Sequence, residues 1–244
     1  MTFEDWLLTA TKSNGDLLSR TSVKRYTSGL KVVSDIMLTK KVISKHLENM
    51  NIYELDVAIC LISQDADFIA KNKKGNKMYS NALKRYRLYK KMNTDIGILE
   101  VIEEVDINKD VTLKTTEKEV LIKARRGQGQ YREDLLKKYC SKCIMTDIDI
   151  KQVLIASHIK PWAVCDNSER IDVNNGLILS ATYDRLFDDG LITFDINGKI
   201  YISSMISNFN RSKLGLSAGK KYDIKYNSKM ADYIKYHNEV IFIK

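Results

Sequence analysis

Proline and histidine are scarce in this chain, and long apolar runs are missing. Its 244 residues include one proline, Pro161, and three histidines, at positions 46, 158 and 237. No run approaches the ~20 apolar residues that cross a bilayer, and the acidic N-terminal start lacks the apolar core of a signal peptide. We therefore expect a cytoplasmic protein with no membrane partner.

Cysteine is also sparse, with four residues spread between positions 60 and 165. This is not the dense pattern of a small disulfide-bonded secreted domain, so reduced thiols are expected. Cys140 and Cys143 form half of a zinc-ribbon signature, but a structural zinc site needs four ligands and no second pair follows. Buried or incidental thiols are therefore favoured over a zinc site.

Acidic residues are outnumbered by basic ones, 31 against 40, which gives a formal net charge of +9. The basic residues are spread along the chain. This balance favours a polyanionic partner, with nucleic acid ahead of a membrane surface, although a basic protein without such a partner is the alternative. The length suits one large domain or two small ones.

Strand signals are nearly absent from residues 1–92, which predicts a helical domain. Apolar residues recur at three and four spacing within 3–11, 23–38 and 52–62. Ser22 and Asn51 are predicted N-caps, and Glu54 completes a capping box with Asn51. Residues 93–118 are interpreted as a connection to a second domain, residues 119–244.

A basic stretch at residues 71–91 interleaves nine lysines and arginines with Tyr79, Tyr86 and Tyr89. On a helix, these basic side chains would be free to meet DNA phosphates. A solvated helix whose tyrosines point inward explains the pattern equally well.

The second half has a different pattern. A helix is predicted over 130–139 after the turn 127–129, followed by a strand-like run over 153–159 and a polar loop over 162–172. A turn then leads into a short helix that ends with Gly190 as its C′ residue. Residues 191–203 predict a hairpin with Asn197-Gly198 as a two-residue turn.

His158 lies at the end of the strand-like run, and Pro161 then stops any strand ladder. Asn175 follows further along, and then Asp184 and Asp188 at i,i+4 spacing. This spacing puts both carboxylates on one helix face, where they can hold Mg²⁺ or Mn²⁺. A solvent-facing stripe that pairs with neighbouring basic residues is the alternative. The other two histidines are interpreted as structural or surface residues.

The order of these motifs resembles the HNH endonuclease family, and more narrowly its branch of bacterial restriction endonucleases. The resemblance lies in R-x-G-Q-x-x-[FY]-R-x-x-L-L-x-x-Y-x-x-x-C at 125–143, ASHIKPW at 156–162 and NGLILSATYDRLFDDGLITF at 175–194. It covers residues 123–207, and residues 72–86 and 230–242 are also similar to such endonucleases. It implies an α+β protein with an N-terminal mainly helical domain followed by an HNH nuclease domain. In that domain two strands, a loop and a helix, together called a ββα-metal finger, surround one divalent metal.

By this resemblance His158 is the general base, and Asn175 holds the loop and the histidine in orientation. Asp184 and Asp188 stand where the helix supplies metal ligands, and their oxygens point to Mg²⁺ or Mn²⁺ as the cofactor. The sequence departs from the family pattern at the third histidine, where Tyr183 and Asp184 stand. It also departs at position 157, a serine where some relatives carry a ligand.

Basic and amide side chains around these motifs are candidates for DNA contact: Lys160, Arg125, Gln128, Arg132 and Arg185. Lys160 and Arg185 are near enough in sequence to contact the scissile phosphate, or are surface charges. The three residues before the finger carry donors suited to phosphates or guanine edges. Arg132 pairs alternatively with an acidic neighbour on its own helix.

The sequence therefore predicts a restriction-type endonuclease that hydrolyses double-stranded DNA and needs no small-molecule cofactor. A palindromic target would require a homodimer, because two sites must act on opposite strands. One alternative is a sequence-specific DNA-binding protein with an inactive finger. Another is a homing, nicking or modification-dependent nuclease with the same chemistry.

Overall fold

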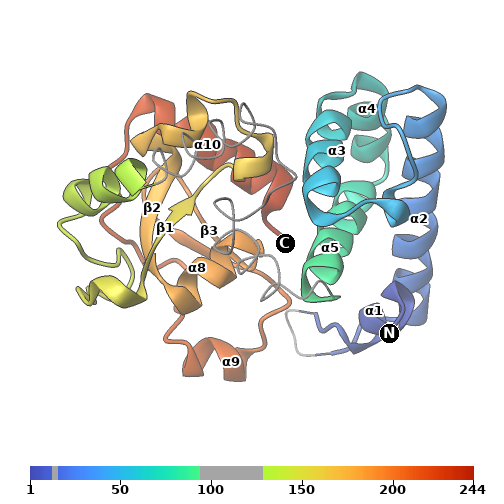
Figure 1. Ribbon diagram of the computed structural model, residues 1–244. Helices are drawn as coiled ribbons and strands as arrows, with labels where there is room; N and C mark the ends of the chain where they lie inside the picture. Colours follow the sequence, from blue (N-terminus) through green and yellow to red (C-terminus); the bar gives the residue numbers. More distant parts are fainter. Residues whose placement is uncertain (13–15, 94–128) are drawn as a thin grey trace, which may run out of the picture.

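The computed structural model describes residues 1–12, 16–93 and 129–244. They form an N-terminal helical region and a C-terminal region of short helices and two small sheets, which lie side by side (Figure 1). The predicted α+β class is confirmed. Of the predicted connection 93–118, only Asn93 lies within the described residues, and the turn 127–129 is described only at Gly129. The bounds of the two domains stay a prediction.

The described residues up to Asn93 form five α-helices: α1 Phe3–Thr9, α2 Arg20–Thr39, α3 Ile52–Gln64, α4 Ala66–Lys74 and α5 Met78–Asn93. Helix α5 contacts each of the other four. The capping box of Asn51 and Glu54 is confirmed at the start of α3. The N-cap of α2 is Ser19, which accepts from the amide of Ser22, so the predicted N-cap at Ser22 was wrong. The first turn of α2 is polar, and apolar periodicity therefore did not reveal it.

The basic residues of α5 depart furthest from expectation. Lys84, Arg85, Arg87 and Lys91 are each less than 9% exposed, so they are neither free for DNA nor solvated. Tyr86 is buried as well, in an aromatic cluster with residues of α1. The exposed basic residues of the stretch lie on α4 and in the turn that follows it. Helix α5 is thus a central helix whose charges need partners inside the protein.

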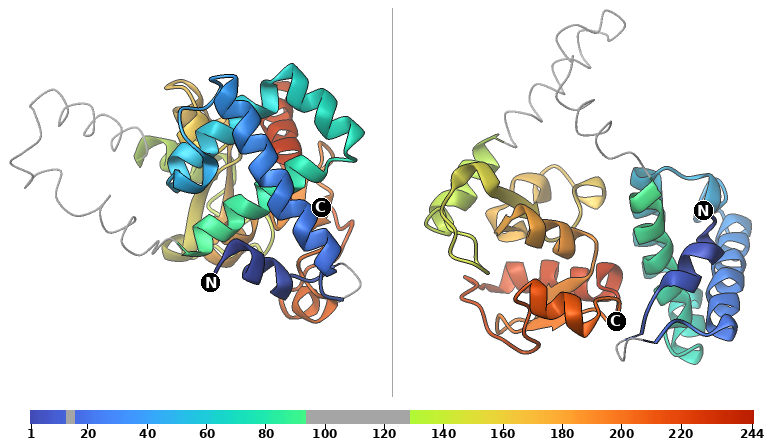
Figure 2. Two further views of the ribbon diagram at one scale, coloured as in Figure 1. Left: turned by 90° about the vertical axis from the view of Figure 1, so that its right-hand side faces the viewer. Right: turned by 90° about the horizontal axis from the view of Figure 1, so that it is seen from below.

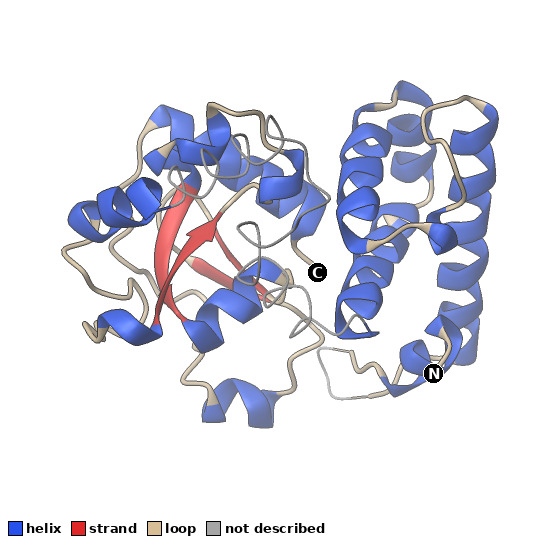
Figure 3. Cartoon of the chain, in the orientation of Figure 1, coloured by secondary structure: helices blue, strands red, loops and turns tan. Residues whose placement is uncertain are grey.

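The C-terminal region holds the strands of the described residues (Figure 3). Residues 129–138 are helical, as predicted apart from the ends. The later elements are β1 Leu154–His158, β2 Gly176–Ser180, α8 Ala181–Asp188, β3 Ile192–Phe194, β4 Ile200–Ile202, α9 Asn208–Lys213, α10 Ser228–Tyr236 and η6 His237–Ile241. Strand β2, which the resemblance implied, was missed by periodicity because all five of its residues are buried and show no alternation.

The two sheets are antiparallel pairs. Strand β1 runs against β2, with His158 opposite Gly176. Strands β3 and β4 form the predicted hairpin, but its turn differs from the predicted two-residue turn. The φ angle is positive at Gly198 and not at Asn197, and the amide of Gly198 donates to the carbonyl of Asp195 at 3.1 Å. The Asp195 carboxylate accepts further amides of the loop and holds this longer turn.

The C-terminal segment joins the two regions. Val240 and Ile241 of η6 belong to the buried cluster that includes Leu55 and Ile59 of α3. The C-terminus accordingly lies at the seam between the two regions (Figure 2). Within the described ranges, no helix combines the length and apolar character needed to cross a membrane.

Gly190 is the C′ residue of α8, as predicted, and Gly190→Ala should destabilise the protein. Its φ is +70°, and an added Cβ would lie 2.3 Å from the carbonyl oxygen of Ile241. The left-handed conformation alone costs an L-residue ~1–2 kcal/mol. We expect the melting temperature to fall by roughly 4 °C or more in thermal denaturation. Gly129→Ala is the control, because no heavy atom lies within 4 Å of its added Cβ. Equal effects of both variants would contradict this explanation.

Candidate active site

The candidate site is built from β1, β2, the loop between them and α8. Helix α8 follows β2 directly and contacts both strands. His158 ends β1, and Asp184 and Asp188 lie one turn apart on α8. Asn175 is the last residue before β2. The fold therefore brings together these four predicted site residues, which span 31 positions of the sequence.

The imidazole of His158 is held on two sides. Its ring stacks on Tyr131, with centroids 4.4 Å apart and planes 14° apart. Its Nε2 lies 3.0 Å from the carbonyl oxygen of Arg170. Because a carbonyl oxygen only accepts hydrogen bonds, Nε2 carries the hydrogen and Nδ1 is the unprotonated nitrogen of the neutral ring. Burial lowers the pKa of His158, against the opposing effect of this hydrogen bond, so the ring is neutral near pH 7.

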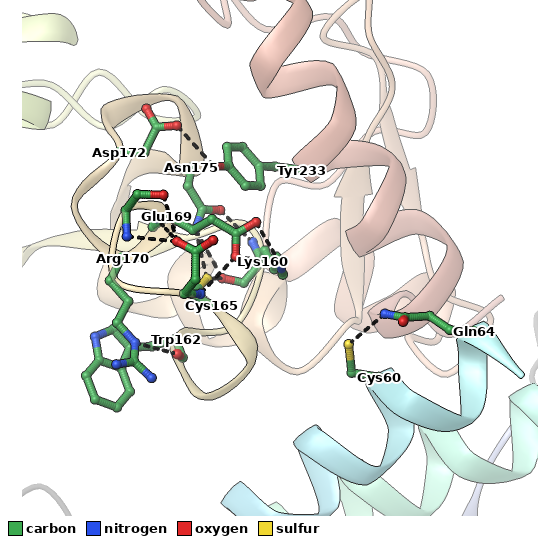
Figure 4. Close-up of polar contacts among 12 residues, drawn as sticks. Cys60, Gln64, Lys160, Trp162, Cys165, Glu169, Arg170, Asp172, Asn175 and Tyr233 are labelled. Atoms are coloured by element: carbon green, nitrogen blue, oxygen red, sulfur yellow. Dashed lines mark hydrogen bonds and ion pairs between the residues drawn. The ribbon is translucent and has the colours of Figure 1, made fainter. Parts of the chain in front are cut away.

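Asn175 is fully buried and ties the loop to the end of β1 (Figure 4). Its Oδ1 accepts from the amide of Lys160 at 2.8 Å, and its Nδ2 donates to the carbonyl of Glu169 at 3.1 Å. Glu169 directly precedes Arg170, whose carbonyl holds His158. Asn175 therefore fixes both the chain that leaves His158 and the chain that orients its ring.

Polar contacts within the loop complete this arrangement. The Lys160 ammonium donates to both carboxylate oxygens of Glu169, at 2.7 and 2.6 Å, and its side chain is 18% exposed. The guanidinium of Arg170 stacks on Trp162, 3.9 Å from the ring centroid. Lys160 thus forms a structural ion pair with Glu169. A phosphate in contact with its ammonium would have to share that group with the Glu169 carboxylate.

The two carboxylates of α8 lie in contrasting surroundings. Burial raises the pKa of Asp184 to about 6, although a hydrogen bond from Ser157 opposes the shift. Partial burial also tends to raise the pKa of Asp188, but the charges of Lys91 and Arg87 outweigh it and lower that pKa to about 2. The side chain of Asp188 is still 43% exposed. The positive charge near Asp184 is therefore too weak to offset its burial, whereas Asp188 is fully compensated.

A divalent cation fits this donor set, though with few protein ligands. Among the described residues, no group of three or more His, Cys, Asp or Glu side chains could hold a metal ion. Mg²⁺ usually binds one or two carboxylates and completes its shell with water and substrate phosphate. Asp184 and Asp188 meet that requirement, and the raised pKa of Asp184 marks a carboxylate that a cation would stabilise.

A buried ion-pair network connects Asp188 to the N-terminal region. Arg87 binds Asp56 through Nε at 2.5 Å and Nη2 at 3.0 Å, and its Nη1 donates to the carbonyl of Asp188 at 2.9 Å. Lys91 pairs with the carboxylate of Asp188 and, at 2.8 Å, with that of Asp189. Helix α5 thereby holds the end of α8 that carries Asp188. Sequence reasoning missed these two basic residues because the stretch at 71–91 was interpreted only as a surface.

Two other residues predicted to contact DNA bind groups of the protein itself. Arg132 donates to the carbonyls of Leu154 and Lys151, at 2.7 and 2.8 Å, and so supports the start of β1. Arg185 pairs with Asp189 at 2.7 Å. Arg125 and Gln128 lie outside the described residues. Tyr131, whose ring supports His158, was noted only as part of a motif.

His237 has the structural role predicted for it. It is 1% exposed, and its ring stacks on Phe187 with centroids 3.9 Å apart. Its Nε2 lies 3.0 Å from the carbonyl of Phe187, and its Nδ1 lies 2.8 Å from the hydroxyl of Thr193. This histidine therefore anchors α8 to η6 and takes no part in the candidate site.

A family model described as HNH endonuclease matches residues 143–195. This segment runs through β1, β2, α8 and β3 and contains the four residues brought together above. No curated protein matches the chain. The resemblance to HNH endonucleases is confirmed over this segment, and the C-terminal region thus contains an HNH endonuclease domain. Such a domain indicates nuclease activity on DNA, and HNH nucleases generally use a divalent metal ion.

Lys91→Met should weaken the attachment of α8 to the N-terminal region. The change leaves the carboxylates of Asp188 and the buried Asp189 without the Lys91 ammonium. Removing one partner of a buried pair costs ~3 kcal/mol or more, and the remaining pairing of Asp189 with Arg185 would reduce that cost. We expect a lower midpoint in chemical denaturation. Lys74→Met, on the exposed end of α4, should leave it unchanged. A wild-type midpoint for Lys91→Met would show that the pair adds little.

Proposed function

We propose that the protein is a restriction-type DNA endonuclease that hydrolyses phosphodiester bonds with His158 as general base. The arrangement of His158 supports this most directly. A backbone carbonyl binds Nε2 at 3.0 Å, the ring is neutral, and Nδ1 is the basic nitrogen. The HNH family match over the same segment supports the reaction class.

In this proposal, Nδ1 of His158 takes a proton from the water that attacks the phosphorus. A general base works best when it is unprotonated at the working pH, and the lowered pKa of His158 meets this condition. The charge that forms on the ring is shared with the carbonyl of Arg170 through the Nε2 hydrogen bond. Asn175 acts as a positioning residue, because it fixes the loop that carries this carbonyl.

Asp184 and Asp188 are the proposed ligands of Mg²⁺ or Mn²⁺. When bound, the cation supplies Lewis-acid stabilisation of the charge that develops on the phosphate and the leaving oxygen. With its pKa lowered to about 2, Asp188 stays ionised near pH 7, whereas Asp184, with a pKa of about 6, takes up a proton as the pH falls through that value when no cation is present. Both ligands are hard oxygens, which favours these two ions over zinc.

Double-stranded DNA is the proposed substrate, and a homodimer is the proposed form if the target is palindromic. The resemblance to restriction endonucleases and the net charge of +9 support this assignment. Two observations favour the second candidate, a DNA-binding protein with an inactive finger. The Asp188 carboxylate is already paired with Lys91, and Ser157 stands where some relatives carry a ligand.

His158→Ala should abolish plasmid cleavage and leave DNA binding nearly intact. Loss of a general base costs ~100- to 10,000-fold in rate. Cleavage is measured with Mg²⁺ or Mn²⁺, and binding by gel shift without metal. His46→Ala is the matched control, because His46 contacts Ser34 in the N-terminal region. Normal cutting by His158→Ala would refute the base assignment. A wild-type protein that binds DNA but cuts with neither metal would favour the inactive finger.

Metal affinity should depend on pH through Asp184, whose pKa is about 6. The cation binds the ionised carboxylate, so the affinity should rise as pH increases toward 6 and level off above it. Below that pH, proton competition should weaken binding about tenfold per pH unit. Titration calorimetry with Mn²⁺ measures this. Asp184→Asn should weaken binding and remove the dependence, while Asp232→Asn, at an exposed site, should change neither. An unchanged pH profile in Asp184→Asn would exclude this residue as a ligand.

A further inference from the structure

A cavity of about 870 Å³ lies at the seam between the two regions, apart from the candidate active site. One wall is formed by the end of α3, α4, α5 and the turn between α4 and α5, and the other by β3, β4 and residues from the end of α10 to the C-terminus. The first wall includes polar residues of the motif at 72–86, which the proposed cleavage chemistry does not use. The lysines among its lining residues are Lys73, Lys77, Lys84 and Lys244.

Lys84 is a buried lysine without an acidic partner. It is 6% exposed, and its ammonium donates to the carbonyl of Phe242 at 2.8 Å. No carboxylate of the described residues lies within ion-pair distance of it. On the same helix, Arg87 and Lys91 are paired with carboxylates. A buried charge without a counter-charge is costly, and an anion in the cavity would supply that counter-charge.

The electrostatics of the cavity agree with this geometry. Burial, followed by repulsion from Lys244 and Lys77, lowers the pKa of Lys84 to about 7, although Glu239 partly offsets the shift. The second acid of the lining is Asp195, whose carboxylate accepts backbone amides of its own turn. Four lysines thus face two carboxylates. Even with Lys84 only partly protonated near pH 7, the other three lysines leave the cavity with excess positive charge.

The backbone between α4 and α5 is held in an unusual conformation beside the cavity. Asn76 and Lys77 have φ angles of 50° and 62°, which few residues other than glycine adopt. Both line the cavity, with Asn72 and Ser80 next to them. Such conformations are strained and tend to occur at ligand-binding and active sites. The turn places an amide and an ammonium at the cavity wall.

We propose that this cavity binds a phosphoryl group through Lys84, Lys77 and the amide side chains beside them. Ammonium and amide groups donate to the several oxygens of a tetrahedral oxyanion. The volume is that of a small-molecule site, which suits a free nucleotide. A DNA phosphate away from the cut presents the same chemical group and is the other source. The proposal does not depend on cleavage, because the cavity contains none of the residues of the candidate active site.

The test is titration calorimetry with inorganic pyrophosphate at pH 7 in metal-free buffer. Wild-type protein should bind it, and Lys84→Met, which keeps the aliphatic stem, should bind at least tenfold more weakly. Lys74→Met is the matched control, because this exposed lysine of α4 does not line the cavity. If Lys84→Met fails to fold, Lys77→Met, at an exposed position, should show the loss instead. The proposal would be overturned if wild-type protein did not bind pyrophosphate. It would also be overturned if the folded Lys84→Met or Lys77→Met variant bound it as tightly as wild-type protein.

Two further measurements distinguish the source of the phosphoryl group. If it belongs to DNA, pyrophosphate should compete with a short duplex in a metal-free gel shift, and Lys84→Met should weaken duplex binding. If it belongs to a nucleotide, the variant should lose affinity for a nucleoside triphosphate and keep that for the duplex. A variant that loses neither affinity would contradict both sources and with them the proposed site.

Discussion

The burial of Arg87 and Lys91 against Asp56, Asp188 and Asp189 is the constraint on which the arrangement of the two regions depends. These charges lie at the seam, where each group is costly unless its partner stays in place. The pairing therefore acts less as a source of net stability than as a requirement for one relative position. Because Arg87 also binds the last carbonyl of α8, this position includes the helix that carries both candidate metal ligands.

The candidate site depends on a second set of buried polar contacts. Asn175 fixes the loop, the loop places the carbonyl of Arg170, and that carbonyl selects the tautomer of His158. The ring of Tyr131 supports the imidazole from the helix at 129–138. The proposed base is thus held by the C-terminal region alone, whereas the proposed ligand Asp188 is also held by the N-terminal region. The general base and the metal ligands of the proposed reaction are therefore positioned by different parts of the protein.

Helix α5 unites these features with the cavity at the seam. Lys84, Arg87 and Lys91 follow one another at three and four spacing and therefore lie on one face of the helix. That face meets the C-terminal region, so each of the three cations has a different environment there. Arg87 and Lys91 pair with carboxylates, whereas Lys84 donates to a backbone carbonyl and lines the cavity. Of these three basic residues, only Lys84 has no carboxylate partner, and this is why the cavity beside it is the proposed anion site.

Local signals in the sequence determined much of the structure: the helical character of the N-terminal region and the capping box at Asn51, the helix at 129–138, the hairpin at 191–203, the C′ glycine of α8, and the order of His158, Asn175 and the two aspartates. These features depend on neighbours within a few residues. Tertiary structure alone decided that β2 is a buried strand, that Lys160 pairs with Glu169, and that the basic face of α5 is covered. Periodicity identifies a face of a helix but does not say what covers it. Asp188, one of the two partners of Lys91, lies 97 residues away, and only the folded chain brings these charges together.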